Sequence, residues 1–166
     1  MTDAGAFNDK ARAAIYLAGL DGCAGCGRTG DLSAQHRRAR GMGGTSDVAI
    51  GHPANGVPLC GGQLAGVRGC HGWAERNPRD AELLGWRLAP GAPALGSPWW
   101  SQRWAAWLAW DEHIETYADD VLRTPVVRLV DLELELDLDR RPEREAALER
   151  MRLARPLPPP PAKPTR

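Results

Sequence analysis

Four cysteines are the first candidates for chemistry, because thiolates at suitable spacing bind metal. Cys23 and Cys26 form a Cys-x2-Cys knuckle whose two sulfurs can face one tetrahedral ion. Cys60 and Cys70 supply a second, wider pair, so Gly61 to Gly69 would have to bulge out as a glycine-rich loop. We predict a structural zinc bound by all four thiolates. The alternative is that the second pair consists of ordinary buried thiols.

A histidine followed by arginines is the second candidate. His36 precedes Arg37, Arg38 and Arg40 in a stretch that ends in a glycine-rich turn. A neutral imidazole can take a proton from water near neutral pH, and arginines can hold phosphate oxygens. The combination suits phosphodiester hydrolysis, with the three arginines as DNA phosphate contacts. Taken alone, a histidine beside arginines is more often an ordinary surface residue.

Two further residues complete a pattern. Asn55 precedes the third cysteine, and His71 directly follows the fourth, so that His36, Asn55 and His71 occur in the order His, Asn, His. Together with the cysteine knuckle, this stretch resembles the HNH endonuclease family. It looks most like small bacteriophage and prophage members that carry His-Arg-x-x-Arg-Gly-Met-Gly-Gly. The resemblance runs from about Cys23 to Leu88, roughly two fifths of the chain.

The resemblance implies an α+β fold built on a small zinc-stabilised ββα-metal finger. His36 would end or follow the first strand and act as the general base, and Asn55 would hold the connecting loop and orient His36. His71 would open the helix and bind a catalytic divalent cation such as Mg²⁺, Mn²⁺ or Ni²⁺, which stabilises the leaving 3′ oxygen. The implied activity is cleavage of DNA to 5′-phosphate and 3′-hydroxyl ends.

Gln35 departs from the family pattern. The residue before the base is commonly Asp or His and serves as a second metal ligand, whereas an amide oxygen is a neutral, weaker donor. Gln35 is therefore expected to bind the catalytic cation with His71, and it favours one alternative function, a zinc-bound DNA-binding module that does not cut. A third reading is a structural zinc protein that acts through its acidic C-terminal part. Phage relatives are often linked to genome packaging, so the resemblance implies terminase or packaging proteins as partners besides DNA.

Length and composition agree with one modest domain. The chain has 166 residues, 43% hydrophobic and 25% charged. No secretory signal is evident, and the longest apolar run, Trp104 to Trp110, is too short to span a bilayer, so we expect a cytoplasmic protein, in the host cytoplasm if phage-encoded. Seven basic residues against three acidic ones give Cys23 to Arg79 a net charge of +4. Such a basic region can meet phosphate while an acidic rear keeps the whole chain neutral.

Four regions are expected: an HNH nuclease domain with the zinc site (8–90), a Trp-rich extension of β or mixed structure (91–130), an acidic strand and helix (131–155), and a disordered Pro-rich tail (156–166). Within the first, Asn8 to Leu20 and Pro78 to Leu84 predict helices, and Trp86 to Leu88 predicts a brief strand. Pro98 to Tyr117 stays open between a helix and a hairpin turning near Asp111-Glu112.

Further along the chain, Leu132 to Leu138 has the alternation of a strand, and Pro142 to Ala154 predicts a charged helix. Asp31 and His52 are expected in a turn and a solvated loop, and His113 receives no role. The seven tryptophans are expected to be core or packing residues rather than a platform for stacked bases.

Overall fold

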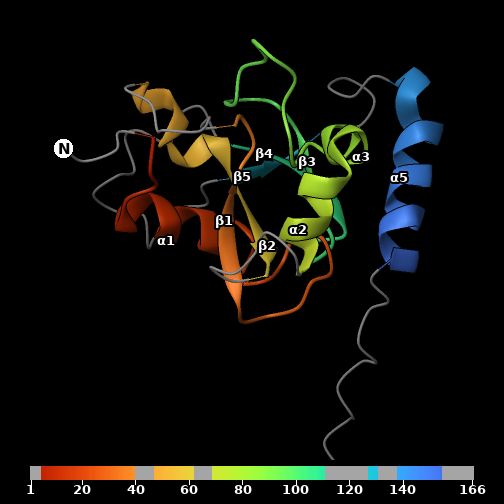
Figure 1. Cartoon of the computed structure of the whole chain (residues 1–166), viewed down its shortest axis with the longest axis horizontal. Coiled ribbons are helices and arrows are strands. Elements are labelled where there is room, and N and C mark those ends of the chain that lie inside the picture. The colour runs from red at the N-terminus through yellow and green to blue at the C-terminus, as the bar shows by residue number, and fades with distance from the viewer. Residues whose placement is uncertain (1–4, 40–46, 62–68, 111–126, 131–137, 155–166) are drawn as a thin grey trace, which may run out of the picture.

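The computed structural model describes residues 5–39, 47–61, 69–110, 127–130 and 138–154. They form a small α+β fold with an N-terminal helix, two small antiparallel sheets and a cluster of four cysteines, as the sequence predicted at this level. In chain order, the elements are α1 (Asp9–Ala18), β1 (Leu32–His36), η1 (Val48–Ile50), η2 (Pro53–Asn55), β2 (Gly56–Cys60), α2 (Gly69–Arg76), α3 (Pro78–Leu83), β3 (Trp99–Ser101), β4 (Ala106–Trp110), β5 (Val127–Leu129), η4 (Leu138–Arg140) and α5 (Arg141–Ala154) (Figure 1).

Helix α1 confirms the predicted N-terminal helix. Asn8 caps it, because its side-chain oxygen accepts a hydrogen bond from the N–H of Ala11 at 2.8 Å. The buried residues recur at the spacing of one helical face, Ala11, Ala14, Ile15 and Ala18. This face packs against β2, where a Cβ added at Gly56 would lie 2.1 Å from Cδ1 of Ile15. Glycine at the start of β2 therefore lets the helix approach the strand closely.

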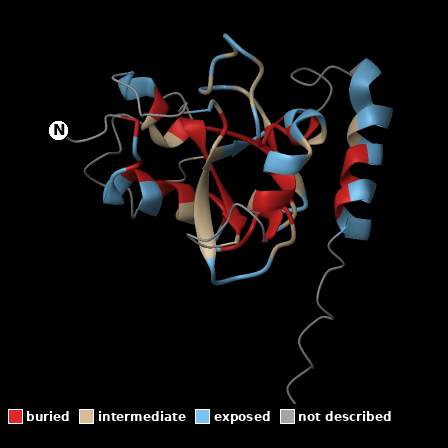
Figure 2. Ribbon diagram, viewed as in Figure 1, coloured by how far each residue is buried: buried red, intermediate tan, exposed pale blue. Residues whose placement is uncertain are grey.

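Strands β1 and β2 pair antiparallel and lie between α1 and α2 (Figure 1). The register places His36 opposite Gly56 at one end of the pair and Leu32 opposite Cys60 at the other. Every residue of β2 is buried, whereas those of β1 are half-buried (Figure 2). Residues from the end of β1 and from the first two turns of α2 line one common cavity beside this strand pair.

The Trp-rich segment forms strands rather than a helix. Strands β3 and β4 make an antiparallel hairpin, with Trp99 opposite Leu108, and β5 pairs with the other edge of β4. The hairpin turns at residues 102–105, where Ala105 has a φ of +49°, and the alternative turn near Asp111-Glu112 lies outside the described residues. The predicted strand Trp86 to Leu88 is also wrong. The N–H of Trp86 instead bonds to the carbonyl of Ala81, which closes a turn after α3.

Four of the seven tryptophans, Trp73, Trp86, Trp99 and Trp110, are buried and have the expected packing role, whereas Trp100 and Trp107 are half-buried and Trp104 is 41% exposed. Helix α5 confirms the predicted charged helix. Its buried residues lie on the side that faces the rest of the molecule (Figure 2), and Arg150 makes two hydrogen bonds to Asp80 of α3, at 2.6 and 2.8 Å.

Several predictions fall on residues outside the described part of the chain, namely the strand at 132–138, most of which is not described, the Pro-rich tail, His113 and Arg40. Among the helices that are described, none has both the length and the apolar character needed to cross a membrane. Asp31 lies exposed between the cysteine knuckle and β1 with a φ of +49°, which fits the turn predicted there. His52 precedes η2 in a loop, but it is half-buried rather than solvated, and its Nδ1 accepts a hydrogen bond from the N–H of Ala54.

Candidate functional site

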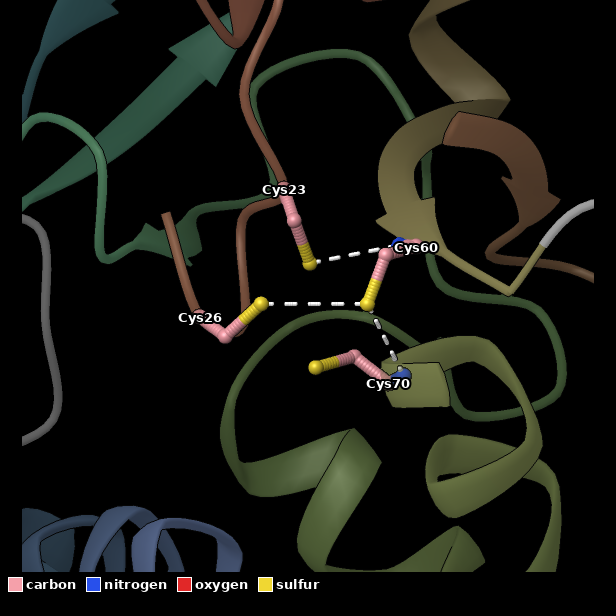
Figure 3. Close-up of side chains that lie close together, drawn as sticks. All are labelled: Cys23, Cys26, Cys60 and Cys70. Carbon is pink, nitrogen blue, oxygen red and sulfur yellow. Dashed lines mark hydrogen bonds between the residues drawn. The ribbon is translucent and has the colours of Figure 1, made fainter. Parts of the chain in front are cut away.

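The four cysteines meet at one point, although they come from three separate parts of the chain (Figure 3). Their sulfur atoms all lie within 4.8 Å of one another, and Sγ of Cys26 lies 3.7 Å from Sγ of Cys60. A tetrahedral zinc with bonds of about 2.3 Å places its sulfurs about 3.8 Å apart. The cluster therefore has the size and donor set of a structural zinc site.

Backbone amides support the sulfurs. The N–H of Cys60 donates to Sγ of Cys23, and the N–H of Cys70 donates to Sγ of Cys60 (Figure 3). Such N–H···S bonds favour the thiolate, which is the form that binds metal. Helix α2 can begin so close to β2 because Gly69 has a φ of +74° and a Cβ there would lie 2.1 Å from the carbonyl oxygen of Cys60.

The pKa values of the four thiols are split by their mutual hydrogen bonds. Contact with Cys23 lowers the pKa of Cys26 to about 7 and holds that of Cys60 well below its usual range. The contact with Cys26 raises the pKa of Cys23, and the contact with Cys23 raises that of Cys70. The thiolate form is thus favoured at Cys26 and Cys60, and a bound cation would stabilise the same form at Cys23 and Cys70.

A second group of polar side chains surrounds a cavity of about 280 Å³. Its lining includes Gln35, His36, His71, Glu75 and Arg87. The first two come from the end of β1, and the next two come from α2, where their spacing of four residues puts them on one helical face. The lining also includes Arg37, so the structure brings together four residues that the sequence analysis selected and adds Glu75 and Arg87.

The ring of His71 has a defined orientation. The hydroxyl of Ser33 donates to the carbonyl of Leu59 at 3.1 Å, so its single hydrogen is used there. Its oxygen also lies 2.6 Å from Nδ1 of His71, so Nδ1 carries the hydrogen when the hydroxyl donates to Leu59. In the neutral ring, Nε2 is then the nitrogen with a lone pair. Burial lowers the pKa of His71, an effect that the nearby Glu75 only partly offsets, so the neutral form is favoured.

Nε2 of His71 lies 3.4 Å from a carboxylate oxygen of Glu75. In the neutral tautomer with the hydrogen on Nδ1, both atoms are acceptors, and neither can donate to the other. Two acceptors held side by side at the wall of a cavity form a donor set that a divalent cation can bridge, because imidazole nitrogen and carboxylate oxygen are both common metal ligands. Glu75 could have been found from the sequence, since it lies four residues after His71 in a segment expected to be helical.

Asn55 is fully buried and holds the loop between β1 and β2. Its side-chain oxygen accepts from the N–H of Arg38 at 2.7 Å, and its amide donates to the carbonyls of Arg38 and Ile50. Its backbone carbonyl also accepts from the N–H of Arg37. These bonds secure the two residues that follow His36, so Asn55 acts on the position of His36 through the backbone.

Arg37 corrects one prediction, because it is fully buried and cannot be a DNA phosphate contact. Its five N–H groups donate to five backbone carbonyls, those of Gly85, Ala54, Ala94, Ser97 and Pro98. Burial lowers its pKa to about 9. The guanidinium thus ties the end of β1 to the segments that follow α3. Sequence alone could not show this, because all its partners are main-chain atoms and four of them lie 48 or more residues away.

Arg37→Met should be strongly destabilising, although methionine fills much of the same volume. Each buried carbonyl left without a donor costs about 1–3 kcal/mol, and small domains have only about 5–15 kcal/mol in total. Arg38→Met is the matched control, because among the described residues the side chain of the half-buried Arg38 makes one long ion pair, with the exposed Asp47 at 3.6 Å. Thermal unfolding should show a large fall in Tm for the first variant and a small one for the second. Equal melting curves would contradict this role of Arg37.

Arg38 is half-buried and its guanidinium lies 3.6 Å from a carboxylate oxygen of Asp47, whereas Arg87 is exposed and lines the cavity. Comparison with known protein-family models finds no match for this chain, and searches of curated proteins and of solved structures find none either. The described residues thus offer a four-thiol cluster that can hold zinc and a polar cavity lined by two histidines, one amide, one carboxylate and two arginines, of which Arg37 is fully buried.

Proposed function

We propose that this chain is a metal-dependent endonuclease of the HNH type, which hydrolyses phosphodiester bonds of DNA. The observation that carries the proposal is the joining of His36, Gln35 and His71 at one cavity by the consecutive elements β1, β2 and α2. The resemblance expects this arrangement of strand end, loop asparagine and helix start. The four-cysteine cluster supports it, since a structural zinc there would fasten α2 to the strand pair.

His71 and Glu75 would hold the catalytic cation, with Gln35 as a neutral third ligand. A bound divalent cation supplies charge that stabilises the scissile phosphate and the leaving 3′ oxygen. His36 takes a proton from water, whose oxygen forms the new bond to phosphorus while the bond to the 3′ oxygen breaks. The leaving oxygen gains a proton from solvent. The products carry 5′-phosphate and 3′-hydroxyl ends.

The other residues of the site orient these groups. Asn55 secures the backbone after His36, and Ser33 holds His71 with Nε2 turned toward Glu75. Arg38 and Arg87 lie where guanidinium groups can bind phosphate oxygens of the DNA backbone. Arg37 has no such part, since all its donors are used inside the fold.

Gln35 favours one alternative, a DNA-binding module of the same shape that does not cut. Its amide donates to the carbonyl of His36 at 3.1 Å, so part of the side chain is engaged with the backbone. A non-cutting module would bind DNA with a steep salt dependence and would be indifferent to changes in His36 or Glu75. The two functions are therefore separated by cleavage, not by binding.

A metal titration of plasmid cleavage tests the proposed ligands. Glu75→Gln removes a charge from the cation site, so it should raise the metal concentration for half-maximal cleavage by about tenfold or more. Gln35→Asp adds a charge and should lower that concentration, whereas Gln35→Ala should raise it. Mn²⁺ and Ni²⁺ should act at lower concentration than Mg²⁺, because imidazole binds them more strongly.

Glu82→Gln is the control for the loss of a carboxylate, because Glu82 is exposed on α3 and does not line the cavity. Its titration curve should coincide with that of the wild type. If the curves of Glu75→Gln and both Gln35 variants also coincide with it while DNA is still cut, the cation is bound elsewhere.

A further inference from the structure

The N-terminal segment before α1 lies directly on His36. The carbonyl oxygen of Gly5 is 2.8 Å from Nε2 of His36, and the ring of Phe7 stacks on the imidazole with centroids 4.0 Å apart and planes inclined by 13°. Both Gly5 and Phe7 are buried. The side chain of His36 thus has one polar contact and one ring contact with residues that lie about thirty positions earlier in the chain.

The fold holds this segment in place. Asn8 caps α1 and so fixes the direction in which the chain leaves the helix toward Phe7. Helix α1 in turn packs through Ile15 against β2, whose first residue, Gly56, is the register partner of His36. The segment is continuous with α1, and His36 is paired with β2. The packing of α1 against β2 therefore fixes the position of the segment relative to His36.

The polar contact determines which ring nitrogen is basic. A carbonyl oxygen can only accept a hydrogen bond, so Nε2 of His36 must carry a hydrogen. In the neutral ring the lone pair is then on Nδ1. The Gly5 carbonyl therefore favours the tautomer whose basic nitrogen is Nδ1.

The stacking contact determines the plane of the ring. Phe7 is the only phenylalanine in the chain, and its ring is 5% exposed. A nearly parallel aromatic partner limits rotation of the imidazole ring about the Cβ–Cγ bond of His36. A base must lie within hydrogen-bond reach of the proton it removes, so a fixed plane directly affects the rate.

We infer that the segment Gly5–Phe7 is a positioning part of the active site, which fixes the tautomer and the ring plane of His36. The inference rests on the proposed function, since it assigns a role to the segment only if His36 is the base. It predicts that Phe7 acts on the rate of the chemical step rather than on DNA binding. Gly5 and Phe7 are positioning residues, because neither is proposed to touch the substrate.

Steady-state cleavage by Phe7→Ala, Phe7→Tyr and the wild type tests this role. Phe7→Ala should lower kcat by roughly ten- to a hundredfold with little change in KM, because the ring of His36 loses its fixed plane. Phe7→Tyr keeps an aromatic ring and should restore most of kcat. Leu148→Ala is the control for loss of core packing, since Leu148 is buried on α5 and makes no contact with the site; it should keep the wild-type kcat.

A second readout does not depend on cleavage. Two-bond ¹H–¹⁵N correlation spectra distinguish a ring nitrogen that carries hydrogen from one that does not. In the wild type, neutral His36 should be in the Nε2–H form, and removal of residues 1–6, which takes away the Gly5 carbonyl, should give a mixture of both tautomers. Leu148→Ala should leave the spectrum of His36 unchanged.

The outcomes separate the inference from the proposed function. A wild type that cuts DNA, together with a Phe7→Ala variant of equal kcat or a truncated variant with an unchanged tautomer, overturns the inference alone. A folded wild type that does not cut removes the proposed function and the catalytic role of the segment with it. A reduced kcat in Leu148→Ala equal to that in Phe7→Ala would show that only stability is involved, and would also overturn the inference.

Discussion

Cys26→Ser should give unfolded or insoluble protein rather than a folded inactive one. Structural zinc contributes about 10–16 kcal/mol in small zinc domains, which equals or exceeds the total stability of most domains of this size. Sγ of Cys26 lies 3.7 Å from Sγ of Cys60, within a cluster that joins the knuckle, β2 and α2. Loss of one ligand would therefore release three parts of the fold at once. Circular dichroism and solubility report the result.

Cys26→His is the matched control. Cys26 is the least buried of the four cysteines, so there is room for a ring, and Cys₃His sites also bind zinc. This variant should retain more folded protein than Cys26→Ser. Elemental analysis should find about one zinc per wild-type chain. Strong chelators should remove this zinc and thereby unfold the protein. Purified, folded wild type without bound zinc would disprove the structural role.

His36→Ala should remain folded and lose most cleavage. General-base catalysis is typically worth about 10²- to 10⁴-fold in rate, so a loss of this size is expected in kcat. DNA binding should survive, because the guanidinium groups of Arg38 and Arg87 are untouched. The rate of plasmid nicking, measured under saturating metal, gives the comparison.

His52→Ala is the control for loss of a half-buried imidazole. His52 caps η2 and does not line the cavity, so its variant should cut DNA at a rate near that of the wild type. A His36→Ala preparation that cuts as fast as the wild type, after contaminating nucleases are excluded by a mock purification, would remove His36 from the mechanism.

Local signals in the sequence predicted the helices and the thiol cluster well. Asn8 before α1 and Asn77-Pro78 at the start of α3 mark helix starts through backbone chemistry that does not depend on the rest of the fold. The knuckle Cys23-x2-Cys26 similarly marks a metal site, and the remaining two cysteines are the expected ligands to complete it. In α3, however, the side chain of Asn77 donates to the carbonyl of Trp73 and does not cap the helix.

Features that depend on distant partners could not be predicted. Trp86 has high strand propensity, yet Gly85 has a φ of +70° and the N–H of Trp86 bonds back to Ala81, so the segment makes a turn. The turn of the Trp-rich hairpin uses Ala105 in a left-handed conformation, which no glycine or asparagine marks. Arg37 resembles a surface arginine in sequence and becomes buried only because five carbonyls converge on it.

Within the candidate site, the family pattern located His36, Asn55 and His71, whereas the fold supplied Ser33, Glu75 and Arg87. Glu75 could have been predicted from helical periodicity, since it follows His71 by four residues and so lies on the same face of the helix. Ser33 and Arg87 were not, because their place beside α2 follows from strand register and from the path of the chain after α3. The sequence pattern thus identifies the proposed reacting groups more easily than it identifies the residues that orient them.

The most direct test of the proposed function is the conversion of supercoiled plasmid by purified, zinc-loaded wild type with added Mn²⁺ or Mg²⁺. Nicked or linear DNA should accumulate with time, stop when EDTA is added, and carry 5′-phosphate and 3′-hydroxyl ends that DNA ligase can reseal. Plasmid that stays supercoiled under every divalent cation, while the same folded protein binds it at low salt, would contradict the proposed endonuclease and favour the non-cutting module.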